Sequence, residues 1–394
     1  MLLFFAFSIV NSYVLTCQSP TEHAPGYSNL TLISFSMVTR HGMRTPMDSY
    51  SSRELNGFWM CDDSSAQSPR MHVSNSNGTM RRYQRVQDPK YVEFPPNCDE
   101  GELILRGMEQ HLELGQFYRK FLVDEIHFLP PYLDQSNIRI RASKVERCIR
   151  SAVSFLNGLY PPASPGERIQ IITGTSGSEF LYPSSGGCDD LRNTWNQFVS
   201  STEFQNRMNS SKELYAEIYQ KLKLTPDLTN WMFLGDWMTS YLCTNQTLPL
   251  VDPLPDNIIQ QSLKDIAYFS YGFFNTQRAV AASPIWRHIF RDIDDFLAMK
   301  PGSGKFQLYS AHDTTIIALL VSLGYVDEKL PPFRSHFAIE LWRDTKSVLY
   351  IRFVFNGQPV GIDFMNNQTL VEYSVLKGKM AQRGDLNYCL KEFP

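Results

Sequence analysis

The sequence has no Cys-x-x-Cys pair among its seven cysteines, which argues against a zinc ribbon and against a thioredoxin-like redox motif. Beyond its first residues it has no apolar segment long enough to cross a bilayer, and it has neither a low-complexity tract nor a fixed-period repeat. Basic residues are not in excess, since 37 Lys and Arg stand against 40 Asp and Glu, for a net charge of −3. We therefore expect no nucleic-acid partner.

The 394 residues have the composition of a globular protein, with 43% hydrophobic and 20% charged residues. This excludes wholesale disorder and a collagen-like chain. The chain is long enough to bury a core without help from a metal. Its length fits two or three domains, and equally one large α/β core with a second domain inserted into it.

The N-terminal residues predict a secretory signal peptide at 1–17. An apolar stretch, MLLFFAFSIV, is followed by Asn11 and Ser12, and we expect cleavage between about Ser12 and Cys17. The alternative is an uncleaved signal anchor that continues through Leu15. The first interpretation predicts a protein that is secreted or lies in the lumen of the secretory or lysosomal pathway. The second predicts a protein of the Golgi membrane.

Glycosylation sequons and cysteines also favour export. If Cys17 leaves with the signal peptide, six cysteines stay, an even number suited to three disulfides whose pairing the sequence does not choose. The sequence does not fix the oligomeric state either, and a dimer is compatible with it. Acceptor sequons begin at Asn29, Asn77, Asn209, Asn245 and Asn367.

Predicted strands alternate with predicted helices along most of the chain. Residues 32–38, 138–141 and 306–310 predict strands, and residues 337–342 with 348–355 predict a hairpin. This order predicts an α/β fold, with a doubly wound, mostly parallel central sheet flanked by helices.

Two segments interrupt this core. Residues 47–98 are rich in Ser, Asn, Pro and Arg and predict a long loop, whereas residues 184–300 are mostly helical. We therefore expect an inserted, mainly α-helical cap at 184–300, with the core in residues 28–183 and 301–394.

The end of the first predicted strand carries a group of charged residues. Arg40 and Arg44 flank His41, and ligands of open α/β sheets bind beyond the carboxyl ends of strands. The two guanidinium groups offer forked donors for a tetrahedral oxyanion. They also disfavour protonation of the imidazole, and a neutral imidazole can take a phosphoryl group and pass it to water. His41 is therefore a candidate nucleophile, and Gly42 would let the backbone approach a ligand.

The end of a late strand carries a second group, in the run Tyr-Ser-Ala-His-Asp-Thr-Thr that ends at Thr315. Asp313 is placed to protonate a leaving alkoxide and then, once ionised, to activate water. His312 offers a further donor to phosphate oxygens, and Arg141, which ends a third strand, offers another guanidinium. Arg139, Arg147 and Arg150 lie close to Arg141 in the sequence and are alternatives for its role. The sequence thus predicts a phosphate site built where strands end.

These residues resemble the histidine acid phosphatase family. The resemblance is carried by the Arg-His-Gly-x-Arg-x-Pro run at 40–46, by the run that contains His312 and Asp313, and by Gly-Met-Glu-Gln-His at 107–111. It extends from about Leu32 to about Phe355. Two segments, 59–61 (Trp-Met-Cys) and 98–103 (Cys-Asp-Glu-Gly-Glu-Leu), look more like the 2-phosphoxylose phosphatase branch.

The resemblance implies an acid phosphatase that needs no metal or other cofactor. It implies that His41 is the phosphorylated nucleophile and Asp313 the proton donor, and that phosphate is bound by Arg40, Arg44, Arg141 and His312. One position departs from the family, which usually has Arg-Ser-Thr-Asp where this sequence has Arg-Ala-Ser-Lys at 141–144. The departure bears on substrate preference more than on the chemistry.

We expect a small phosphomonoester or a phosphorylated sugar as the substrate. Within the same chemistry, the alternative is a 2-phosphoxylose phosphatase of the secretory pathway that acts on the linker xylose of proteoglycans. An alternative of another class is an inactive, secreted phosphoanion- or glycan-binding protein that keeps the fold.

Overall fold

Strands gather into one central sheet in the computed structural model. The structure describes residues 15–47, 59–61, 94, 98–163, 167–175, 179–184, 186–248 and 254–393. Within these residues eight strands lie in the order β3-β2-β4-β1-β5-β6-β7, and β8 pairs with β6. The strands are β1 (Thr31–Arg40), β2 (Ile138–Ala142), β3 (Ile172–Thr173), β4 (Phe306–Ala311), β5 (His336–Arg343), β6 (Leu349–Phe355), β7 (Gln358–Pro359) and β8 (Leu370–Glu372).

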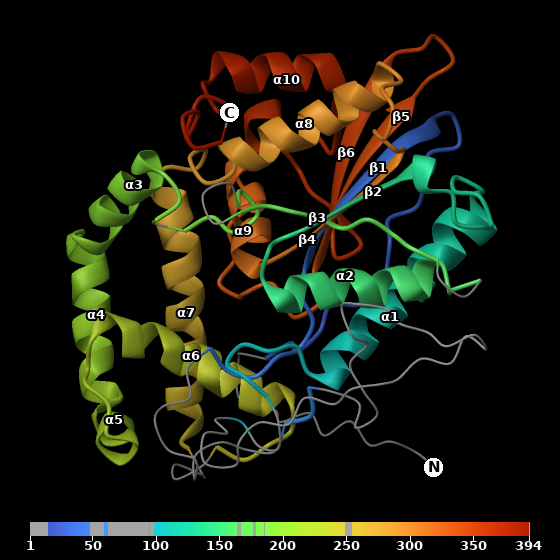
Figure 1. The fold of residues 1–394 in the computed structure, drawn as a ribbon. Coiled ribbons are helices and arrows are strands. Elements are labelled where there is room, and N and C mark those ends of the chain that lie inside the picture. Colours follow the sequence, from blue (N-terminus) through green and yellow to red (C-terminus); the bar gives the residue numbers. More distant parts are fainter. Residues whose placement is uncertain are drawn as a thin grey trace, which may run out of the picture.

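Helices cover the sheet and also stand beside it (Figure 1). They are α1 (Leu105–Arg119), α2 (Glu146–Leu159), α3 (Asp189–Val199), α4 (Thr202–Leu214), α5 (Ala216–Leu222), α6 (Leu228–Cys243), α7 (Asp256–Thr276), α8 (Ser283–Leu297), α9 (Asp313–Ser322) and α10 (Tyr373–Gln382).

The α/β fold is confirmed, but the sheet is mixed rather than mostly parallel. β3, β2, β4 and β1 run parallel to one another, whereas β5 to β8 pair antiparallel. The expected dominance of parallel strands is wrong for the half of the sheet beyond β1. The connection between β5 and β6 spans only 344–348, and so short a connection joins antiparallel strands, since a parallel pair needs a long crossover.

Apolar side chains line both faces of the central strands. On one face, Phe35, Ile140 and Leu308 pack against α1 and α2. On the other, Val38 and Tyr309 belong to a second cluster that includes α8 and α9. Strands covered on both faces have near-continuous apolar runs, which is why residues 32–38 and 306–310 do not alternate. This burial holds the ends of β1 and β4 at one edge of a rigid layer.

Helices α3 to α7 form a group beside the sheet, which we call the cap (Figure 1). The cap has an aromatic core in which the ring of Trp231 lies 5.7 Å from that of Phe204 and 6.3 Å from that of Phe269. α8, by contrast, packs on the sheet, where Trp286 lies 5.3 Å from Phe353. The expected boundary of the cap at residue 300 is therefore too late, because the apolar side of α8 faces the sheet.

The cysteine pairing differs from the expected one. The pairs are Cys17–Cys243, Cys61–Cys98 and Cys188–Cys389, and Cys148 is unpaired and buried. The expectation that Cys17 leaves and the other six pair is wrong for this structure, because Cys17 reaches the end of α6. Two of the three disulfides join the cap to segments outside it, at Cys17 and at Cys389.

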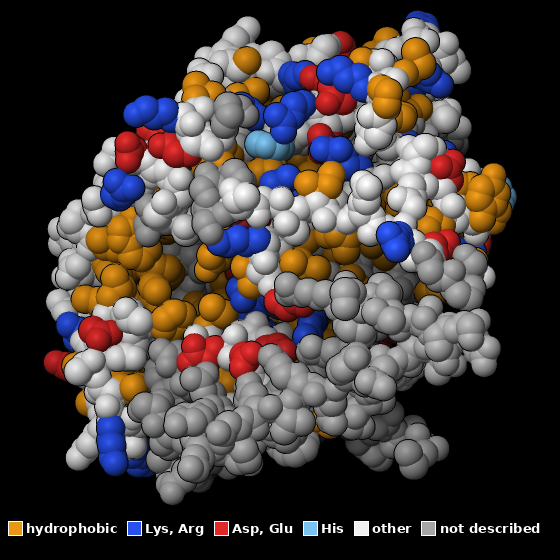
Figure 2. All heavy atoms as spheres, in the orientation of Figure 1, with side chains coloured by type: hydrophobic (Ala, Val, Ile, Leu, Met, Phe, Trp, Pro, Cys, Tyr) orange, Lys and Arg blue, Asp and Glu red, His pale blue; other side chains and the backbone are white. Residues whose placement is uncertain are grey.

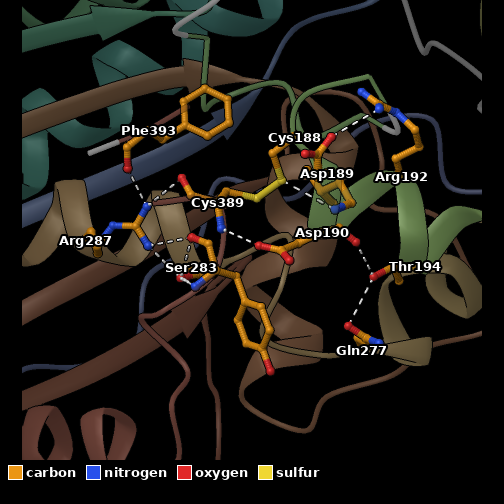
Figure 3. Close-up of a disulfide and its surroundings, with 12 residues drawn as sticks. Cys188, Asp189, Asp190, Arg192, Thr194, Gln277, Ser283, Arg287, Cys389 and Phe393 are labelled. Atoms are coloured by element: carbon orange, nitrogen blue, oxygen red, sulfur yellow. Dashed lines mark hydrogen bonds and ion pairs between the residues drawn. A yellow bond between two sulfur atoms is a disulfide. The ribbon is translucent and has the colours of Figure 1, made fainter. Parts of the chain in front are cut away.

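The C-terminal segment is also held by an arginine (Figure 3). Arg287 of α8 donates to the carbonyl oxygens of Leu386 at 2.7 Å and Tyr388 at 2.8 Å. Beside the disulfide, the carboxylate of Asp190 in α3 accepts from the backbone N–H of Cys389 at 2.8 Å. The start of α3 is thus tied to the core by a covalent bond and a hydrogen bond.

Two predicted segments fall mostly outside the described residues. Residues 1–14 of the expected signal peptide lie there, as does most of the expected insertion at 47–98. Among the insertion's described residues, Trp59, Cys61 and Phe94 are buried. No helix in the described part of the chain is long and apolar enough to cross a membrane.

The disulfide pattern is testable by peptide mapping of the unreduced protein. We expect the three pairs above and one thiol, at Cys148, that is alkylated only after unfolding because the side chain is buried. We also expect the double variant Cys188→Ser/Cys389→Ser to lose about 2–5 kcal/mol of unfolding free energy. A map with Cys148 in a disulfide, or with Cys243 free, would contradict the pairing.

Candidate active site

The two predicted strand ends meet at one edge of the sheet. Arg40 lies opposite Ala311 in the parallel pair of β1 and β4, so the next residues along each strand, His41 and His312, are neighbours. Their ring centroids lie 5.7 Å apart. The two motifs that the sequence separates by some 270 positions therefore form one cluster.

His41 is buried, and the hydrogen bond to its ring fixes the position of its proton. Nδ1 lies 2.8 Å from the carbonyl oxygen of Gly42, and because a carbonyl only accepts, Nδ1 carries the proton. Nε2 therefore carries the free lone pair. Burial, followed by the positive charges of Arg147, Arg44 and Arg40, holds the pKa of His41 well below its usual value of 6.5. The imidazole is thus kept neutral and nucleophilic.

Gly42 serves helix packing rather than ligand approach. A Cβ at this position would lie 2.2 Å from the carbonyl oxygen of Gly107 in α1. The reverse holds as well, since a Cβ on Gly107 would lie 2.1 Å from the carbonyl oxygen of Met43. The two glycines let the start of α1 pack directly on the loop that carries His41. Gly42 therefore makes room for α1, whereas we expected it to make room for a ligand.

Arg40 joins the proposed nucleophile to the proposed acid. Its Nη2 lies 2.8 Å from Oδ2 of Asp313, the first residue of α9, whose side chain is 22% exposed. On the other side, Nη1 donates to the carbonyl oxygen of Pro331 at 2.5 Å, and the guanidinium lies 4.3 Å from the centre of the Phe333 ring. These contacts leave the guanidinium little freedom, so Asp313 is held within reach of the cluster.

Arg44 is fixed by a carboxylate of the cap that the sequence analysis missed. Asp236 of α6 accepts from its Nη2 at 2.6 Å and from its Nη1 at 3.2 Å. The same carboxylate accepts from the backbone N–H of Met47 at 2.9 Å. Burial alone would raise the pKa of Asp236, but the charge and hydrogen bonds of Arg44 outweigh it and hold the pKa below its usual 3.8. The cap thus supplies an ionised group to the site.

Arg147, and not Arg141, is the third guanidinium of the cluster. Arg147 stands in the first turn of α2, and its Nη2 lies 3.4 Å from Nδ1 of His312. Arg141 instead points to the α8 face of β2, where its guanidinium lies 4.4 Å from the centre of the Phe180 ring. Of the expected residues, Arg141 therefore lies outside the cluster, because strand alternation turns it to the α8 face of the sheet.

His312 is bounded by three residues that the sequence analysis also missed. Its Nε2 lies 3.0 Å from Oγ of Ser143 and 3.5 Å from Sγ of Cys148. The ring of Tyr182, which is 39% exposed, lies 4.5 Å away. Since Arg147 can only donate, Nδ1 of His312 accepts and Nε2 carries the proton. Burial and the three arginines lower the pKa of His312, so it is a neutral donor rather than a charged one.

Three buried guanidinium nitrogens in the cluster have no hydrogen-bond partner among the described residues. They are the Nε atoms of Arg40, Arg44 and Arg147. The Nε atoms of Arg141, Arg287 and Arg334, outside the cluster, lack a partner as well, so what distinguishes the cluster is the gathering of three guanidinium groups around one imidazole. A phosphate group offers both the negative charge and the oxygens that such donors need. The arrangement can therefore bind phosphate beside Nε2 of His41.

Charged side chains lie next to hydrophobic ones where the surface is hollowed between the cap and the core (Figure 2). Two groups of potential metal ligands occur in the described residues, and both consist largely of disulfide cysteines. Their sulfur atoms are already bonded, so neither group makes a metal centre beside His41.

Comparison with known proteins identifies the family. A model of the histidine phosphatase superfamily (branch 2) matches residues 31–356. The chain belongs to branch 2 of the histidine phosphatase superfamily.

Relatives and solved structures of this superfamily agree with the assignment. The chain is 28% identical to Counting factor 60 of Dictyostelium discoideum, over 87% of this chain and 84% of that protein. It is 26% identical to a probable acid phosphatase of the same organism, over 88% and 78%. It is 27% identical to human lysophosphatidic acid phosphatase type 6, over 66% and 61%.

The fold of the superfamily is shared with solved phytases. The Hafnia alvei phytase superposes with a TM-score of 0.61 at 12% identity, over 91% of this chain and 98% of that chain. A multiple inositol polyphosphate phosphatase of Bifidobacterium longum gives 0.59 at 12% identity, over 92% and 95%. With its family and its acid phosphatase relatives, the chain is a phosphatase that hydrolyses phosphate monoesters.

The choice between the two arginines can be tested by matched substitutions. Arg147→Ala should lower kcat/KM for a phosphate monoester by about 10²–10³-fold, the usual cost of removing one donor to a developing oxyanion. Arg141→Ala should lower it less than about threefold, because that guanidinium lies on Phe180. Equal losses in the two variants would contradict the assignment of Arg147.

The contribution of the cap can be tested at Asp236. Asp236→Asn removes the charge that holds Arg44, and we expect kcat/KM to fall about 10-fold to 100-fold, the value of one charge-assisted hydrogen bond. The matched control is Asp265→Asn, at a buried carboxylate of α7 bonded to Ser211 and Tyr215 in the cap. The control should lower the melting temperature with little change in kcat/KM of the folded enzyme. A similar loss of activity in both would assign Asp236 to stability alone.

Proposed function

We propose that this protein is an exported acid phosphatase that hydrolyses phosphate monoesters through a phosphohistidine at His41. The observation that carries the proposal is the free Nε2 lone pair of a buried, neutral imidazole among the guanidinium groups of Arg40, Arg44 and Arg147. A nucleophile and a set of phosphate-oxygen donors are thereby brought together. Phosphoryl transfer needs mainly such positioning and charge stabilisation.

The first step transfers the phosphoryl group to the imidazole. Nε2 of His41 donates its lone pair to phosphorus as the bond to the ester oxygen breaks, and Asp313 gives its proton to that leaving oxygen. Arg40, Arg44 and Arg147 hold the remaining phosphate oxygens. His312, which we expected to donate as well, has its Nε2–H on Ser143 and its Nδ1 on Arg147, so its part is to hold Arg147 in place. Throughout this step Nδ1 of His41 keeps its proton and donates it in a hydrogen bond to the carbonyl oxygen of Gly42.

The second step returns the enzyme to its starting state. The Asp313 carboxylate takes a proton from water, the resulting hydroxide oxygen bonds to phosphorus, and the bond from phosphorus to Nε2 breaks. Inorganic phosphate leaves, His41 is neutral again and Asp313 is protonated again. Because Asp313 has to start protonated, we expect an acidic pH optimum. The low pKa of His41 keeps its lone pair available under those conditions.

Export is supported by the disulfides and by the sequons. Three disulfides are typical of oxidising compartments. The sequon asparagines Asn29, Asn209, Asn245 and Asn367 are exposed, whereas Asn77 lies outside the described residues. A signal peptide that agrees with the pairing of Cys17 ends before that residue.

The names of the similar proteins point to two different kinds of substrate. One relative is named for lysophosphatidic acid, whereas the solved structures are phytases and an inositol polyphosphate phosphatase. We propose the shared chemistry, hydrolysis of a phosphate monoester, as the function.

The phosphohistidine can be trapped by rapid mixing with labelled nitrophenyl phosphate and quenching in alkali, in which phosphohistidine survives. We expect Asp313→Ala to accumulate the label, because an aryl leaving group needs little protonation in the first step while the second step still lacks its base. His41→Ala should take up no label. Label on another residue, or turnover by the His41→Ala variant at the wild-type rate, would contradict the proposal.

A further inference from the structure

A cavity of about 200 Å³ lies next to the phosphate site, on the far side of Arg40. Its walls come from four parts of the molecule: the loop before β5, the end of β6 with Asn356, helices α6 and α7 of the cap, and the described start of the chain at 15–16. We call it the Arg40 cavity.

The walls of the Arg40 cavity are mainly apolar. An apolar wall stabilises a hydrocarbon group and offers no compensation to a buried charge. The apolar part of the wall is therefore suited to the hydrocarbon part of an amphiphilic ligand. The apolar lining residues are Leu15, Leu263, Ile266, Leu330, Pro331, Pro332, Phe333 and Phe355, and the polar ones are Thr16, Arg40, Thr239, Asp327, Lys329 and Asn356.

The guanidinium group of Arg40 belongs both to the wall of the cavity and to the phosphate site. Arg40 lines the cavity, packs on Phe333 and donates to the carbonyl oxygen of Pro331, another lining residue. Its other terminal nitrogen holds Asp313 at 2.8 Å. In the proposed mechanism Asp313 protonates the leaving oxygen, so the leaving group lies on the same side of the phosphate as Asp313. The cavity begins one side chain away from that position.

We propose that the Arg40 cavity receives the apolar part of the leaving alcohol, so that the preferred substrates are phosphate monoesters of apolar alcohols rather than polyanions. This inference rests on the proposed function, because it assigns a side to the leaving group. The volume of the cavity limits the size of the apolar group that it can hold, since a cavity of about 150 Å³ holds benzene. A group of about six to eight carbon atoms should fill the Arg40 cavity.

The test is a series of straight-chain alkyl phosphates, from ethyl to dodecyl, below their micelle-forming concentrations. We expect kcat/KM to rise about fourfold for each methylene group that enters the cavity, and to level off once the cavity is full at about six to eight carbons. Inositol hexakisphosphate should be a poorer substrate than hexyl phosphate.

Two variants locate the effect. Ile266→Phe partly fills the cavity and should make kcat/KM level off at a shorter chain, with the value for ethyl phosphate unchanged. The matched control is Ile259→Phe, the same substitution on α7 at a half-buried residue that does not line the cavity. It should keep the wild-type profile. Leu330→Ala enlarges the cavity and should move the plateau to longer chains, which gives a second reading if Ile266→Phe folds poorly.

A failure of this inference can be distinguished from a failure of the proposed function. Turnover of ethyl phosphate with no dependence on chain length would overturn this inference and leave the proposed function intact. The same dependence of kcat/KM on chain length in Ile266→Phe and Ile259→Phe would also overturn this inference and leave the proposed function intact. No turnover of any ester by the wild-type protein would contradict the proposed function, and the inference with it.

Discussion

The site depends on the crowding of positive charge around one imidazole. Burial lowers the pKa of His41 most, and the three buried guanidinium groups of Arg147, Arg44 and Arg40 lower it further. Burying like charges together is costly unless each is paired. Asp236 pairs with Arg44, and Asp313 pairs with Arg40 when its carboxyl is ionised, whereas Arg147 has no carboxylate partner among the ion pairs of the described residues. The same field that attracts the substrate keeps the nucleophile unprotonated.

The cap is part of this charge balance and not only a cover. Arg44 belongs to the core, whereas the carboxylate that fixes it belongs to α6. The Cys17–Cys243 disulfide holds the end of the same helix, and the Cys188–Cys389 disulfide holds the start of the cap. The position of a phosphate-binding side chain is therefore set by the docking of the cap. A loosened cap would change catalysis before it exposed any core.

The sequence predicts those site residues that follow strands directly. Arg40 ends β1 and is followed by His41 and Arg44, whereas His312 and Asp313 follow β4, and the register of the sheet brings them together. Arg147 was only an alternative to Arg141, because it comes from the first turn of a helix and not from a strand. Alternation along β2 puts Arg141 on the same face of the strand as Arg139, and this pattern could have shown that Arg141 turns away from the cluster. Asp236 is the single charged residue of helix α6, a pattern that indicates a cationic partner but does not identify it.

The broad architecture was also predictable, whereas the docking of its parts was not. The buried strands are continuous apolar runs, so their positions follow from the sequence. That α8 belongs to the sheet rather than to the cap depends on packing between residues far apart in the chain, such as Trp286 and Phe353. The disulfide partners depend on the same packing. The 2-phosphoxylose branch suggested by residues 98–103 stays a prediction, because substrate choice is decided by side chains around the leaving group.

The central claim concerns one imidazole, and its protonation can be measured directly. NMR of the protein with ¹⁵N-labelled histidine, titrated from neutral to acidic pH, reports the pKa and tautomer of His41, assigned by His41→Ala. The account predicts a neutral ring with the proton on Nδ1 at pH values well below 6.5. A ring that gains its second proton at or above pH 6.5, or that carries its single proton on Nε2, would contradict it.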